Sequence, residues 1–97
     1  MNLAIYGAQA IALGAYKAIK LLYPERSVNC FLVSDIKENP AMLSGLSVRE
    51  IAEYAGRLSP DEKENTEILI ATPESVMAEI ENTLEIYGFY CHVRLTS

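Results

Sequence analysis

Short apolar runs that alternate with helical segments most constrain the fold of this 97-residue chain. The runs are apolar along most of their length, which is typical of strands buried on both faces. Parallel strands joined by helices explain this alternation, so we expect a parallel sheet covered on both sides. The strands are expected at residues 2–6, 28–33, 67–71 and 89–95, with a very short one at 46–48.

Right-handed crossovers leave few ways to order such strands in one sheet. We expect an α/β fold with three layers, a Rossmann-like parallel sheet of four to five strands in the order 3-2-1-4-5. The length suffices for one hydrophobic core and is too short for two, so residues 1–97 are expected to form a single domain.

The first helix is expected from Ala10 to Leu22, because Pro24 disfavours helical geometry at the residue before it. Its small residues indicate close packing on a sheet. The stripe expected to face that sheet consists of Ile11, Ala15, Ala18 and Leu22.

Capping signals predict where the other helices begin and end. Ser47 with Glu50, and Ser59 with Glu62, match the capping box. Thr72 followed by Pro73 predicts a further helix start, with the threonine as cap. That helix is expected to turn Val76, Met77, Ile80, Leu84 and Tyr87 inward and to stop at Gly88.

Composition and charge exclude several classes of protein. Hydrophobic residues make up 51% of the chain and charged residues 22%, which is typical of a globular domain. The net charge of −5 and the scattered basic residues argue against nucleic acid as a partner. Lys17 and Lys20 interrupt the apolar start, and no basic region precedes it, so neither a secretory signal nor membrane insertion is expected. We therefore interpret the chain as a cytoplasmic domain.

The residues that most often carry metal or catalytic chemistry are few. Cys30 and Cys91 each lie in an apolar strand-like run and are expected to be buried, reduced thiols. Together with the single His92 they give no metal-site spacing. His92 is interpreted as a core or edge histidine of the last strand, and no acid–histidine–nucleophile set can be assembled around it.

The turn after the first strand matches part of a phosphate-binding motif. Written against G-x-G-x-x-G/A, it begins with Gly7 and has the allowed alanine, Ala12, at the third position. Gln9 replaces the middle glycine, where a side chain would meet a pyrophosphate. Gln9 either obstructs a dinucleotide or donates its amide to a phosphate or sugar. In the simplest alternative, Gly7 serves only a tight strand–helix turn.

Two further loops follow strands at the same predicted sheet edge. Asp35 follows the second strand at about the distance of an acid that binds ribose hydroxyls, although it could equally cap a turn. Thr72 could face the same crevice or only cap its helix. The candidate binding residues are Gly7, Ala8, Gln9, Ala10, Ile11, Ser34, Asp35, Thr72 and Pro73.

In this order, "AIYGAQAIALGAYKAI", "CFLVSD", "NPAMLSGLSV" and "ILIATPES" resemble the N-terminal nucleotide-sugar-binding domains of bacterial polysaccharide-biosynthesis proteins. That group includes sugar acetyltransferases of the sialic-acid O-acetyltransferase type and the N-terminal parts of nucleotide-sugar dehydratase-like proteins. The matching positions are Gly7, Asp35, 45–48 and 71–73. Gln9 departs from the usual small residue.

The resemblance implies a domain that binds a nucleotide or nucleotide-sugar, such as a UDP-sugar or an NAD-like nucleotide, and catalyses nothing alone. It also implies excision from a longer protein with a C-terminal catalytic domain. A second interpretation is a vestigial Rossmann scaffold for docking or homodimerisation. A third, an NAD-binding oxidoreductase fragment, is disfavoured because no residue offers hydride-transfer chemistry.

Overall fold

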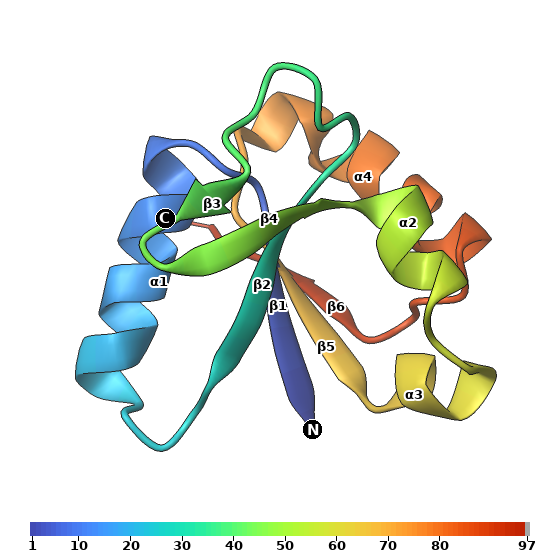
Figure 1. Cartoon of the computed structure of the whole chain (residues 1–97), viewed down its shortest axis with the longest axis horizontal. Helices are drawn as coiled ribbons and strands as arrows, with labels where there is room; N and C mark the ends of the chain where they lie inside the picture. Colours follow the sequence, from blue (N-terminus) through green and yellow to red (C-terminus); the bar gives the residue numbers. More distant parts are fainter. Residues whose placement is uncertain (97) are drawn as a thin grey trace.

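The computed structural model describes residues 1–96, which form one sheet between two helical layers (Figure 1). The elements are β1 (Asn2–Tyr6), α1 (Ala10–Leu22), β2 (Val28–Val33), β3 (Met42–Leu43), β4 (Leu46–Glu50), α2 (Ile51–Gly56), α3 (Pro60–Glu64), β5 (Thr66–Ile70), the 3-10 turn η1 (Glu74–Val76), α4 (Met77–Ile86) and β6 (His92–Arg94).

The sheet has six strands in the order β3-β4-β2-β1-β5-β6. All neighbouring pairs are parallel except β3 and β4. The α/β fold with a mainly parallel sheet is thus confirmed, and the parallel strands follow the expected sequence of crossovers. The strand count and the full order differ from expectation, because β3 adds an antiparallel edge strand to the parallel ones.

β3 lies in residues 36–45, a segment that the sequence predicts to be a loop because Asn39, Pro40 and Gly45 are turn residues. Its hairpin turn consists of Ser44 and Gly45, whose φ angles are 52° and 84°. Two residues with positive φ are what a tight two-residue hairpin requires, and Leu43 pairs directly with Leu46 across it. The turn therefore brings Met42 and Leu43 beside β4 despite the proline and polar residues before them.

The two faces of the sheet carry separate cores, with α1 on one face and α2 and α4 on the other (Figure 1). On the α1 side, Ala12 and Ala15 pack against β1 and β2. The α1 stripe predicted from the sequence is mostly wrong: Ala15 is buried, whereas Ala18 is exposed, Ile11 is 43% exposed and Leu22 is 66% exposed. The alanines let the helix axis approach the sheet closely, and this leaves the larger apolar side chains of α1 at its sides.

On the other face, α4 buries Met77, Ile80 and Leu84, as predicted, and Gly88 adopts a φ of 92° just beyond the helix. Tyr87 packs partly against this core, whereas Val76 is 38% exposed. The inward orientation predicted for Val76 is therefore wrong.

Only one of the two predicted capping boxes forms. Ser59 accepts a hydrogen bond from the Glu62 amide, and the Glu62 carboxylate accepts one from the Ser59 amide. Ser47 instead lies in β4, where it pairs with Met42, and α2 begins only at Ile51. Strand pairing overrides the local capping signal at Ser47.

None of the helices within residues 1–96 is both long enough and apolar enough to cross a membrane.

Candidate functional site

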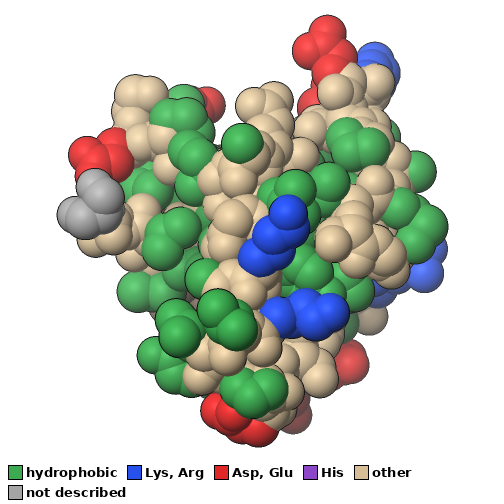
Figure 2. Space-filling view, turned by 90° about the vertical axis from the view of Figure 1, so that its left-hand side faces the viewer, with side chains coloured by type: hydrophobic (Ala, Val, Ile, Leu, Met, Phe, Trp, Pro, Cys, Tyr) green, Lys and Arg blue, Asp and Glu red, His purple; other side chains and the backbone are tan. Residues whose placement is uncertain are grey.

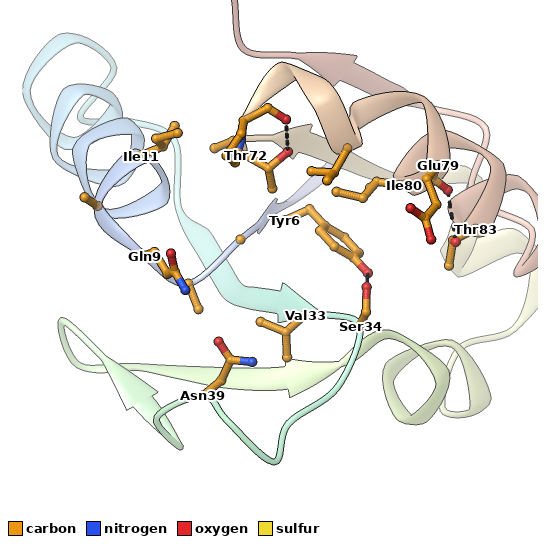
Figure 3. A pocket seen from close by; sticks show the side chains of 16 residues that line it. Tyr6, Gln9, Ile11, Val33, Ser34, Asn39, Thr72, Glu79, Ile80 and Thr83 are labelled. Atoms are coloured by element: carbon orange, nitrogen blue, oxygen red, sulfur yellow. Dashed lines mark hydrogen bonds between the residues drawn. The ribbon is translucent and has the colours of Figure 1, made fainter.

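A cavity of about 430 Å³ opens at the carboxyl edge of the sheet (Figure 3). The turns after β1, β2 and β5 line it, together with η1 and the first turns of α4. β1 lies between β2 and β5, so the chain leaves the sheet in opposite directions around this point. Ligands of open α/β sheets bind at such a reversal of strand order.

Gly7 fixes the turn that forms one wall of the cavity. Its φ is 130°, and a Cβ at this position would lie 2.6 Å from the Ala71 carbonyl oxygen. The Gly7 N–H donates to the Leu32 carbonyl over 2.7 Å, and the Ala71 N–H donates to the Tyr6 carbonyl over 2.9 Å. The turn is therefore held tightly between the ends of β2 and β5, and only glycine fits there.

Gln9 is the N-cap residue of α1, but its side chain makes no capping hydrogen bond to this helix. The Gln9 carbonyl accepts the Leu13 N–H over 3.0 Å. The first amides of α1 thus have no side-chain acceptor from the cap, and Gln9, Ala10 and Ile11 line the cavity. Amides at a helix N-terminus carry a partial positive charge.

The loop after β2 contributes differently from what its sequence suggests. The Ser34 hydroxyl lies 2.6 Å from the hydroxyl of Tyr6 and lines the cavity. The carboxylate of Asp35 instead accepts a hydrogen bond from the Lys37 amide over 2.9 Å, in a turn outside the cavity lining. The Asp35 carbonyl accepts from the Asn39 side chain over 2.7 Å. This turn holds Asn39 at the cavity wall.

The loop after β5 also differs from its predicted local structure. Thr72 does not cap a helix, because its hydroxyl donates to the Pro73 carbonyl over 3.3 Å and α4 begins only at Met77. Thr72 and Pro73 line the cavity, followed by Val76 of η1 and Ile80 of α4. The 3-10 turn delays the helix and so brings its first turns alongside the opening.

Four polar lining residues were not among the candidates: Tyr6, Asn39, Glu79 and Thr83. The sequence pattern indicates an ordinary strand residue at Tyr6, and it places Glu79 and Thr83 on the solvent-exposed face of a helix. The Asn39-Pro40 turn signal was visible, although it did not indicate where the asparagine would point. Of the nine candidates, Asp35 lies outside the lining, while Gly7, Ala8, Gln9, Ala10, Ile11, Ser34, Thr72 and Pro73 line the cavity.

The cavity wall is mainly apolar, with a few hydroxyl and amide groups and little charge. Glu79 is its one charged side chain among the described residues, and no lysine or arginine of residues 1–96 lines it. Burial raises the pKa of Tyr6, the hydrogen bond between Tyr6 and Ser34 lowers it, and Tyr87 and Glu79 raise it again. Tyr6 is therefore a neutral hydroxyl at physiological pH that can donate or accept a hydrogen bond.

The remaining chemistry-bearing residues lie outside the cavity lining. His92 is on the edge strand β6, where its Nε2 lies 2.8 Å from the Glu85 carboxylate and its Nδ1 lies 3.6 Å from that of Glu81. Cys30 and Cys91 are both free, the first buried and the second partly exposed. Both carboxylates near His92 belong to α4.

Neither the protein-family models nor the curated protein sequences compared with this chain give a match.

Proposed function

We propose that this domain binds a nucleotide or nucleotide-sugar in the cavity at the carboxyl edge of its sheet. One observation carries the proposal: three strand-end loops and the N-terminus of α1 converge on one cavity at the reversal of strand order. By its sequence resemblance, the domain would be the cytoplasmic recognition part of a bacterial polysaccharide-biosynthesis protein, with catalysis in a linked domain.

The dimensions and lining of the cavity support this function. Its volume lies within the roughly 300–1,000 Å³ typical of small-molecule sites. Val76 and Ile80 offer an apolar wall for a base or sugar ring, and hydroxyl and amide groups surround it (Figure 3). The amides at the start of α1 offer donors to a phosphate.

Calorimetric titration and thermal unfolding with UDP, UDP-glucose, NAD and coenzyme A test the proposal. A ligand at one hundred times its dissociation constant should stabilise the domain by about 2.7 kcal/mol. Val76→Trp should fill the cavity mouth and abolish binding. Leu21→Trp, on the exposed side of α1, should leave it unchanged. Absence of binding by the unaltered domain to all four compounds refutes the proposal.

The apolar surface around β6 favours a second candidate function, self-association. Val93 is 49% exposed on this edge strand and lines a mostly apolar hollow. The other residues of this hollow are Leu3, Ile19, Tyr23 and Leu69, together with the ion pair of Arg26 and Glu67. Figure 2 shows hydrophobic side chains spread over the α1 side of the molecule, with Lys and Arg side chains among them near its centre and acidic groups at its margins. Edge strands and apolar patches are common contact surfaces between copies of a chain.

Sedimentation equilibrium of the unaltered domain and of Val93→Glu tests self-association. A dimer that dissociates in the variant would support it, and a concentration-independent monomer would refute it.

A further inference from the structure

The charge distribution of the cavity limits which part of a ligand can lie where. The first amides of α1, beside Gln9, give one end a partial positive charge. Glu79 lies at the other end, on α4, and Figure 3 shows it across the cavity from Gln9, with Tyr6 and Ser34 between them. A phosphate next to Glu79 would face an uncompensated carboxylate, because no cationic residue of the described chain lines the cavity.

The Glu79 carboxylate is available to a ligand. It makes no hydrogen bond or ion pair with any side chain or backbone group of residues 1–96, whereas the neighbouring glutamates Glu81 and Glu85 are paired with β6. Figure 3 shows it on the same side of the cavity as the hydroxyls of Tyr6 and Ser34. Thr83, one helical turn on, also lines this end, and its hydroxyl donates to the Glu79 carbonyl over 3.1 Å.

A carboxylate beside neutral hydroxyls matches the hydroxyl groups of a sugar. A carboxylate accepts hydrogen bonds through both oxygens, and two adjacent sugar hydroxyls can donate to them together. The Tyr6–Ser34 pair can turn one further hydroxyl toward the ligand, because either oxygen can be the donor between them. This end of the cavity therefore suits a neutral polyol and disfavours an anion.

We propose that Glu79 holds a vicinal diol of the ligand's sugar at the α4 end of the cavity, with the phosphate at the α1 end. The inference rests on the proposed nucleotide or nucleotide-sugar binding and fixes its direction. It also assigns the sugar-binding acid to α4, and not to Asp35 after β2. Asp35 is engaged with the Lys37 amide in its own turn.

Calorimetric titration of the unaltered domain, Glu79→Gln and Asp35→Asn tests the assignment, with UDP-glucose, UDP and 2′-deoxy-UDP as probes. Both substitutions remove one negative charge from an exposed side chain and keep its size, so Asp35→Asn is a matched control. Glu79→Gln should weaken binding of UDP-glucose about ten-fold, because charge-assisted hydrogen bonds become neutral ones. Asp35→Asn should leave it within about two-fold.

The other probes distinguish the two sources of the diol. If the hexose lies at Glu79, the substitution weakens UDP-glucose alone. If the ribose lies at Glu79, Glu79→Gln weakens the binding of UDP as well. In that case 2′-deoxy-UDP also binds the unaltered domain more weakly than UDP does. Thermal unfolding of both variants, and Glu79→Ala as a second variant, check that the fold is retained.

Equal or tighter binding of UDP-glucose by Glu79→Gln overturns the assignment, and tighter binding would place the phosphate at this end. If Asp35→Asn weakens the binding of UDP-glucose and Glu79→Gln does not, Asp35 is the acid that binds the sugar. If the unaltered domain binds none of the probes, the proposed function itself fails, and the assignment fails with it.

Discussion

Replacement of Gly7 by alanine should destabilise this domain more than any other single methyl addition at its glycines. The new Cβ would lie 2.6 Å from the Ala71 carbonyl oxygen and 3.1 Å from the Cβ of Ala12. The backbone also holds a φ of 130°, a conformation that costs a residue with a side chain about 1–3 kcal/mol. Relief of the clash must move backbone on both sides, which adds about 1–3 kcal/mol.

The expected loss for Gly7→Ala is therefore about 2–6 kcal/mol in the free energy of unfolding, measured by urea titration. In a domain of this size each kcal/mol lost lowers the melting temperature by about 4–8 °C, so the melting temperature should fall by at least about 8 °C.

Gly14→Ala is the matched control, because Gly14 lies within α1 and has nothing within 4 Å of an added Cβ. Alanine there should stabilise the domain by about 0.5–1 kcal/mol, since glycine is the poorer helix former. A Gly7→Ala variant within 0.5 kcal/mol of the unaltered domain would refute the tight turn between β2 and β5 described above.

Three further substitutions test other parts of the structure. Gln9→Ser should supply the missing side-chain cap of α1 and raise the free energy of unfolding in urea by about 0.5–1 kcal/mol, and a loss would show that the cap geometry is wrong. Ser34→Ala should remove the hydrogen bond that lowers the pKa of Tyr6, so ultraviolet titration of the tyrosines should show one ionising at still higher pH; an unchanged titration would contradict this contact. Burial raises the pKa of the Cys30 thiol to about 11, and Arg49 and Glu53 have smaller, opposing effects on it. The contribution of the buried thiol to stability is therefore complete below about pH 9, and it is lost as pH rises toward 11. Urea unfolding should show this loss as about 2–3 kcal/mol that is absent in Cys30→Ala, and equal pH dependence of the two proteins would contradict it.

Local sequence signals predicted those features whose causes are local. The C-terminal end of α1 follows from Pro24 just beyond it, and the Ser59 capping box needs only residues within one helical turn. Ser47 carries the same signal as Ser59, yet it lies in β4, opposite Met42 of β3. The residues next to each serine in the sequence do not indicate that Ser59 caps a helix whereas Ser47 lies in a strand.

The candidate site divides in the same way. The strand–glycine–helix pattern located the turn at Gly7, and the strand ends located Ser34 and Thr72, because the carboxyl ends of parallel strands meet at one edge. The side-chain directions within the loops could not be read from the pattern. A turn closed by the Lys37 amide engages the Asp35 carboxylate outside the cavity lining, and it holds Asn39 at the wall instead.

The sequence by itself determined that this chain forms an α/β sheet with a glycine turn at the end of its first strand, because strand, helix and turn preferences act over a few residues. Only the tertiary structure decided that Ala12 faces the sheet in place of Ile11, and that Glu79 lines the cavity. The rotation of a helix about its axis is set by how closely it packs on the sheet. The position of α4 is set by the 3-10 turn that precedes it, and both depend on contacts between segments distant in the chain.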